Sequence, residues 1–135
     1  ATDWLSTRAD TASCAVGYFG ASTGAGAALW AASEPSARIA AVVSRGGRPD
    51  LAGPRLSAVT APTLLIVGSL DHEVLELNRR AKAMMRCPSQ LAVVQGATHL
   101  FEEPGTLAAA AILARDWFVD NLLAPDGASP RAAGV

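Results

Sequence analysis

A serine with a glycine two residues away on either side is the first place in this sequence where chemistry is expected. Residues 20–24 read G-A-S-T-G, the pattern of a nucleophile elbow, a sharp turn that exposes a serine hydroxyl between a strand and a helix. An apolar run precedes it and a run of small residues follows it, so the local order predicts that geometry for Ser22. Gly20 and Gly24 would let strand and helix approach closely. The backbone N–H of Thr23, at the start of the helix, would face an oxyanion.

A serine hydroxyl is a poor nucleophile until a base takes its proton, and two residues further along the chain supply a base and an acid. Ser22, Asp71 and His99 each follow a predicted strand. Because the carboxyl ends of parallel strands meet at one edge of a sheet, the three side chains are expected to lie near one another. His99 would accept the proton from Ser22, and Asp71 would hold the imidazole in the required tautomer.

Other assignments remain open at this stage. Ser22 and Asp71 are also suitable N-caps for the helices that follow them. His72 is the alternative base, although it directly follows the expected acid. The alternative carboxylates are Asp50, Glu102 and Glu103. The loop after the second predicted strand contains Arg45 and Arg48, which are either contacts for an anionic group of a substrate or ordinary solvated arginines.

The elements that must position these residues alternate between strand and helix. Apolar runs predict strands over residues 15–19, 39–44, 63–67 and 91–94. The intervening segments predict helices over 23–32, 73–85 and 106–123, with a short helix within 2–11. In the helix over 73–85, helical spacing places Val74, Leu77, Ala81 and Met84 on the core face. The alternation predicts an α/β fold of about four parallel strands with flanking helices in three layers. Residues 1–124 would form a single domain, and the Pro/Gly/Ala-rich segment 125–135 would be a disordered tail.

Composition narrows the classes of partner. Eleven basic and twelve acidic residues give a net charge of −1 without charged blocks, so no nucleic-acid or membrane-surface partner is expected. No apolar run approaches the roughly 20 residues that span a bilayer. Cys14 and Cys87 lack the spacing of metal ligands and are expected to be buried free thiols in a cytoplasmic protein. No metal and no cofactor are predicted.

Three motifs together resemble those of the α/β-hydrolases, and within them the dienelactone-hydrolase-like branch. They are residues 20–24, the run A-P-T-L-L-I-V-G-S-L-D over 61–71, and G-A-T-H-L-F over 96–101. The order Ser, Asp, His along the chain is also that of α/β-hydrolases. The resemblance covers residues 12–123, and the sequence is also similar to the hydrolase-like segment of some bacterial phosphoribosyltransferase-type proteins.

This resemblance implies a minimal α/β-hydrolase that acts as a serine carboxylesterase. Ser22 would be the nucleophile, Asp71 the acid and His99 the base, and no cofactor would be needed. The expected substrates are small or short-chain carboxylic esters, cleaved through an acyl-enzyme. Dienelactone hydrolases proper use a cysteine nucleophile, so the serine found here means that lactone specificity is not implied.

The sequence also departs from the family at its start, because the family's first strands have no counterpart in it. Those strands carry the loop that supplies one of the two oxyanion amides, which leaves the N–H of Thr23. Without them, residues 14–19 would form an exposed sheet edge, so we expect a homo-oligomer that covers this edge. A second hypothesis is a non-catalytic or barely active hydrolase remnant that serves as an accessory or interaction domain.

Overall fold

The computed structural model describes residues 2–8 and 14–123, and the tail predicted over 125–135 lies outside them. Its centre is one sheet of four parallel strands in the order β1-β2-β3-β4. The strands are β1 (Gly17–Ala21), β2 (Ala41–Arg45), β3 (Thr63–Gly68) and β4 (Ser89–Val94). β3 is buried along its whole length, as its uninterrupted apolar run predicts.

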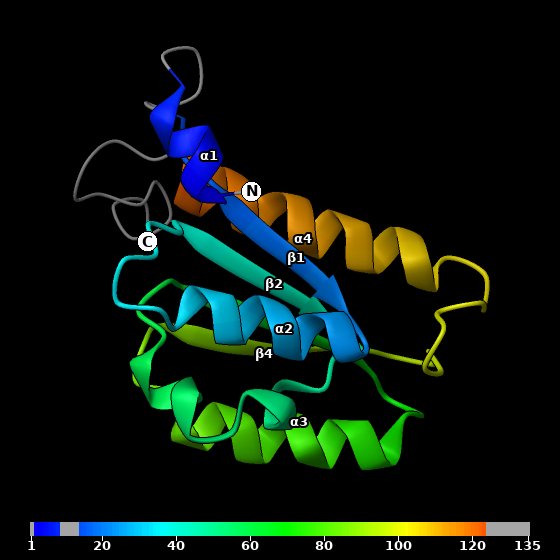
Figure 1. The fold of residues 1–135 in the computed structure, drawn as a ribbon. Coiled ribbons are helices and arrows are strands. Elements are labelled where there is room, and N and C mark those ends of the chain that lie inside the picture. Colours follow the sequence, from blue (N-terminus) through cyan, green and yellow to red (C-terminus); the bar gives the residue numbers. More distant parts are fainter. Residues whose placement is uncertain (1, 9–13, 124–135) are drawn as a thin grey trace.

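Helices cover both faces of this sheet. They are α1 (Thr2–Thr7), α2 (Thr23–Ala32), α3 (His72–Met84), α4 (Thr106–Leu122) and the 3₁₀-helical segment η1 (Pro49–Ala58). Figure 1 shows α2 and α3 on one side of the sheet and α4 on the other. The three-layer α/β architecture expected from the alternating pattern is therefore confirmed.

Two apolar cores lie between these layers, one on each face. Neighbouring residues of a strand point to opposite faces. Val42 accordingly packs with Leu29 and Leu56 under α2 and η1, whereas Val43 packs with Phe101 and Ala110 under α4. The sheet is thus held from both sides, and its carboxyl edge is a rigid platform for the residues that follow each strand.

The structure corrects some predicted details. β1 and β2 each begin two residues later than predicted, because they start together where Gly17 pairs with Ala41. The buried residues of α3 are Leu75, Asn78 and Ala81, while Met84, expected in the core, is 49% exposed. The buried face of α3 therefore differs from the predicted apolar face. It includes the polar Asn78, whose amide donates to backbone carbonyls inside the fold.

The two cysteines differ in burial. Cys14 is exposed, so the prediction of a buried thiol was wrong there, and Cys87 is intermediate. Burial raises the pKa of the Cys87 thiol. Within the described ranges there is no group of His, Cys, Asp or Glu suited to a metal ion. Among those same residues, no helix has both the length and the apolar character required to cross a membrane.

Candidate active site

The serine of the predicted elbow lies at a strained turn between β1 and α2. Ser22 has φ 50° and ψ −125°, a conformation that non-glycine residues rarely adopt and that is concentrated at functional sites. Two of its backbone hydrogen bonds join it to the segment that ends β2 and follows it. The N–H of Ser22 donates to the carbonyl of Arg45 (3.4 Å), and the N–H of Arg48 donates to the carbonyl of Ser22 (2.9 Å).

The two glycines of the motif differ in their surroundings. A Cβ on Gly20 would lie 2.6 Å from Cα of Ala25 and 2.6 Å from the carbonyl oxygen of Gly24. The steric expectation therefore holds for Gly20, where the end of the strand touches the start of the helix. At Gly24, a Cβ would meet no described atom within 4 Å. Close packing within the described residues therefore does not require a glycine at this position.

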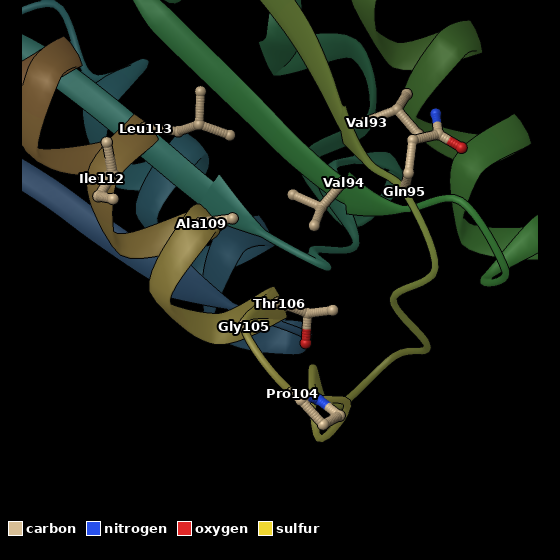
Figure 2. Close-up of a pocket in the computed structure, with 9 residues that line it drawn as sticks. All are labelled: Val93, Val94, Gln95, Pro104, Gly105, Thr106, Ala109, Ile112 and Leu113. Carbon is tan, nitrogen blue, oxygen red and sulfur yellow. The ribbon is translucent and has the colours of Figure 1, made fainter.

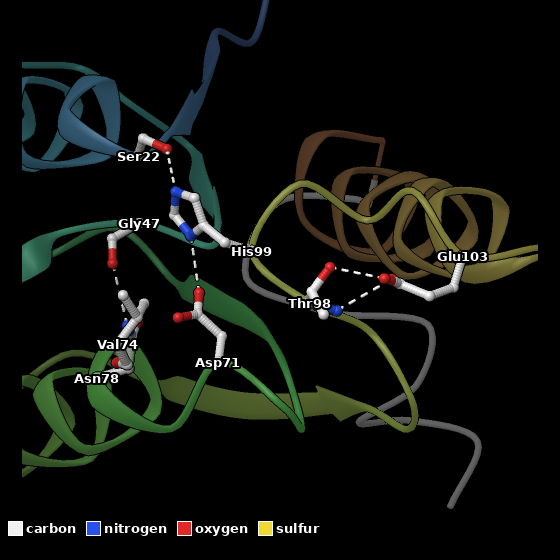
Figure 3. Close-up of polar contacts among 8 residues, drawn as sticks. All are labelled: Ser22, Gly47, Asp71, Val74, Asn78, Thr98, His99 and Glu103. Carbon is white, nitrogen blue, oxygen red and sulfur yellow. Dashed lines mark hydrogen bonds and ion pairs between the residues drawn. The ribbon is translucent and has the colours of Figure 1, made fainter.

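A continuous hydrogen-bond relay connects the serine to a carboxylate. Ser22 Oγ lies 2.8 Å from His99 Nε2, and His99 Nδ1 lies 2.7 Å from Asp71 Oδ2 (Figure 3). An ionised carboxylate can only accept, so the proton on the neutral imidazole lies on Nδ1. The lone pair of Nε2 then faces the hydroxyl of Ser22, which is the arrangement that a general base requires.

The strand ends position this relay. Asp71 lies in the turn between β3 and α3, and His99 lies in the connection between β4 and α4. The side chain of Asp71 is 13% exposed and that of His99 is 40% exposed, so the carboxylate is sheltered and the imidazole is open to solvent. Neither Ser22 nor Asp71 makes a side-chain cap bond to its helix; the structure directs both side chains to His99 instead.

The alternative residues have other partners or positions. His72 is in the first turn of α3 and is exposed, as is Glu102. Asp50 accepts two hydrogen bonds from the guanidinium of Arg48, at 3.0 and 2.8 Å. This pairing lowers the pKa of the Asp50 carboxyl and raises the pKa of Arg48.

Glu103 has a role at the site that the sequence did not reveal. Its carboxylate accepts the backbone N–H of Thr98 (3.0 Å) and the Thr98 hydroxyl (2.6 Å), as Figure 3 shows. These hydrogen bonds lower the pKa of Glu103. Because Thr98 precedes His99, the two bonds help to fix the backbone that carries the histidine. No spacing rule identifies such a contact in advance.

The predicted oxyanion donor is available. The N–H of Thr23 has no hydrogen-bond partner among the residues that the structure describes, as expected for the first residue of a helix. It is therefore free to donate to an oxygen at the elbow.

Two of the hollows on the α4 side of the sheet lie near its carboxyl edge. One, of about 580 Å³, lies between the end of β4 and the first turns of α4 (Figure 2), and none of Ser22, Asp71 and His99 lines it. The other, of about 430 Å³, is lined by Phe19, Arg45 and four residues of α4, which are Leu107, Ala110, Ala111 and Ala114. The Arg45 guanidinium in this second hollow lies 5.2 Å from the centre of the Phe101 ring. None of Ser22, Asp71 and His99 lines the second hollow either, but one of its lining residues, Arg45, accepts the N–H of Ser22 through its carbonyl.

Comparison with known proteins places this geometry in context. No protein-family model matches the chain. Two curated relatives, from the CDC 1551 / Oshkosh and H37Rv strains of Mycobacterium tuberculosis, are each 66% identical over 124 residues, and both are named "Putative phosphoribosyl transferase". The match covers 92% of this chain but only 28% of the length of these relatives.

Among solved structures, the dienelactone hydrolase from Anabaena variabilis matches with a TM-score of 0.87 and 54% identity, over 90% of this chain and 56% of its own. The esterase domain of a Rhodothermus marinus protein matches with a TM-score of 0.74 and 19% identity, over 90% of this chain and 66% of its own. A Pyrococcus furiosus esterase matches with a TM-score of 0.67 and 18% identity, over 89% of this chain and 59% of its own. At such identities the two esterases show the fold alone.

The fold is therefore that of the α/β-hydrolases, in a minimal form with four described strands. The likeness to a dienelactone hydrolase at 54% identity confirms the resemblance to the dienelactone-hydrolase-like branch. The 66% identity to the mycobacterial proteins confirms the similarity to a segment of phosphoribosyltransferase-type proteins.

Proposed function

We propose that this chain is a serine carboxylesterase that cleaves small or short-chain carboxylic esters through an acyl-enzyme. The single observation that carries the proposal is the unbroken relay from Ser22 Oγ through His99 to Asp71, with contacts of 2.8 and 2.7 Å. A non-catalytic interaction domain would need neither this relay nor the strained turn that presents the serine.

The reaction follows from the roles of the three side chains. His99 Nε2 takes the hydroxyl proton while Ser22 Oγ attacks the ester carbonyl, and the resulting oxyanion accepts the N–H of Thr23. The imidazolium, stabilised by Asp71, then returns the proton to the leaving alkoxide, so an alcohol departs and an acyl-serine remains. In the second half, a water molecule gives its proton to His99 and attacks the acyl carbon, which releases the acid and restores Ser22.

The second hollow is the proposed site for the body of the ester. Its lining of Phe19 and small apolar residues of α4 suits a short carbon chain, and Arg45 is the proposed polar contact. Arg48 is the weaker candidate for contacting substrate, because Asp50 already engages its guanidinium. If the N–H of Thr23 acts as the sole oxyanion donor, turnover should be about 10²–10³ below that of an enzyme with a donor pair.

Self-association is part of the proposal, as a homo-oligomer that covers the edge of the sheet near residues 14–19. β1 lies at the edge of the sheet that the described residues form, and Phe19 on it is 53% exposed. Such an edge has unpaired backbone groups that favour pairing with another strand. A second copy of the chain would cover this backbone edge.

The test is hydrolysis of p-nitrophenyl acetate together with labelling by a fluorophosphonate, which reacts with activated serines. The wild-type chain should turn over the ester and be labelled at Ser22, whereas Ser22→Ala should do neither. Ser57→Ala, at an exposed serine on η1, should match the wild type in both assays. Turnover that survives Ser22→Ala, or label found on another serine, would remove Ser22 as the nucleophile.

A further inference from the structure

The loop over residues 45–48, which starts at the last residue of β2, contacts both the nucleophile and the base. Its two ends bind the backbone of Ser22, through the Arg45 carbonyl and the Arg48 N–H. At its centre, Gly46 has φ +55°, and a Cβ built there would lie 3.5 Å from Nδ1 and 3.6 Å from Cε1 of His99. The position of this loop therefore affects how Ser22 and the imidazole meet.

One buried side chain, Asn78 of α3, fixes this loop. Its Nδ2 donates to the carbonyl of Gly47 (3.1 Å) and to the carbonyl of Val74 (2.8 Å), and Figure 3 shows it reaching from α3 toward the loop beside Asp71 and His99. Asn78 is 0% exposed. On the opposite side of the loop there is little free space, because a Cβ on Gly47 would lie 2.0 Å from Ser44 Oγ and 2.4 Å from Cβ of Ala25.

The amide of Asn78 is only partly satisfied. Its Oδ1 is buried without a hydrogen-bond partner in the part of the chain that the structure describes. A buried polar atom left unpaired is destabilising, and an apolar side chain of similar shape would avoid that cost. Such groups call for an explanation, and local rules of stability are most often broken where a site must be held in place.

We propose that Asn78 is a positioning residue for the Ser22–His99 pair and acts through the Gly47 carbonyl and the loop 45–48. The role rests on the proposed esterase function. α3 begins directly after Asp71 and carries Asn78 two turns later, so one rigid helix fixes both the acid and the loop that supports the nucleophile and the base. Asn78 itself does not touch the reacting atoms.

Asn78→Leu tests this role, because it removes both N–H donors while keeping a side chain of similar size. The matched control is Thr63→Val. Thr63 is also 0% exposed and also donates to a backbone carbonyl, that of Ala61 (2.9 Å), but it lies at the opposite end of the sheet. Each substitution removes buried hydrogen bonding to a backbone carbonyl, so both should lower the melting temperature.

Two readouts separate positioning from stability. The first is the pair of kinetic constants, kcat and KM, for p-nitrophenyl acetate. The second is the low-field NMR signal of the His99 Nδ1 proton, which is assigned by its loss in His99→Ala. A displacement of reacting groups by about 1 Å can cost about 100-fold in rate. Asn78→Leu should therefore lower kcat about 10- to 100-fold with little change in KM, and should shift or broaden the His99 signal. Thr63→Val should change neither. A wild-type His99 signal and kcat in Asn78→Leu, or equal effects in Thr63→Val, would overturn the proposal.

A second pair of variants decides the question if Asn78→Leu does not fold. Gly46→Ala and Gly53→Ala introduce a methyl group at similar positive φ angles, +55° and +52°, but the Gly53 methyl would meet no described atom within 4 Å. Gly46→Ala should shift the His99 signal and Gly53→Ala should not; equal behaviour would refute a role for the loop. The NMR readout needs no turnover. If Ser22→Ala retained full esterase activity, the proposed function would fail, while the His99 signal would still decide the role of Asn78.

Discussion

Replacing Asp71 with asparagine should slow ester hydrolysis strongly without disturbing the fold. Asp71 Oδ2 accepts the proton of His99 Nδ1 at 2.7 Å, and its side chain is only 13% exposed. Asparagine has the same shape and keeps an oxygen that can accept, so packing around the turn before α3 should be retained. What changes is the charge next to the imidazole and the tautomer that the imidazole prefers.

Both changes can be given a magnitude. A carboxylate about 4 Å from the centre of an imidazolium stabilises it by about 4 kcal/mol at an effective dielectric constant of about 20. Because the His99 side chain is 40% exposed, solvent screening reduces this to about 2–3 kcal/mol, or about 30- to 160-fold in rate. The amide N–H of asparagine can also donate to Nδ1, which moves the proton to Nε2 and leaves Ser22 without a base. The combined loss in kcat should be about 10³- to 10⁴-fold.

The assay is the steady-state hydrolysis of p-nitrophenyl acetate at neutral pH, with thermal unfolding measured on the same samples. Glu76→Gln is the control, since it removes a carboxylate that pairs with Arg79 and Arg80 on the exposed side of α3 and not with His99; its rate should stay within about threefold of the wild type. A loss of less than tenfold in a folded Asp71→Asn variant, with Ser22→Ala inactive, would refute Asp71 as the partner of the base.

Three further predictions concern the elbow, the histidine loop and the sheet edge. Gly20→Ala should lower stability by about 1–3 kcal/mol in thermal unfolding, because its methyl group would overlap the start of α2, while Gly24→Ala, with free space around its Cβ, should not; equal losses would contradict this. The Glu103 carboxyl has a lowered pKa in the folded state because Thr98 donates to it, so its stabilising contribution is present above the unfolded-state pKa and is lost as the pH falls through the folded-state value. The Thr98 amide NMR shift should follow that loss, and a midpoint at or above the ordinary value of 4.5 would contradict the contact. Phe19→Lys should weaken self-association measured by light scattering, and a wild-type monomer of 13.8 kDa at micromolar concentration would remove the proposed oligomer.

The sequence alone determined the fold class and the set of residues that meet at the candidate site, because both depend on patterns that are local or that follow from topology. The G-x-S-x-G spacing predicts the strained turn at Ser22 from only five residues. Alternating strands and helices predict a parallel sheet, and a parallel sheet brings the carboxyl ends of its strands to one edge. Chain order then predicts that Asp71 and His99 reach Ser22, although 77 residues separate the serine from the histidine.

Only the tertiary structure decided how these residues are supported, because the supporting contacts join segments that no periodicity links. Helical spacing predicted an apolar face on α3 that included Met84, but the fold buries Asn78, whose partner Gly47 lies 31 residues earlier. The same holds for the Glu103 carboxylate, which finds the backbone of Thr98 through the shape of a loop. A polar side chain can be buried only where a partner is in reach, and which partner is in reach depends on how the finished layers pack.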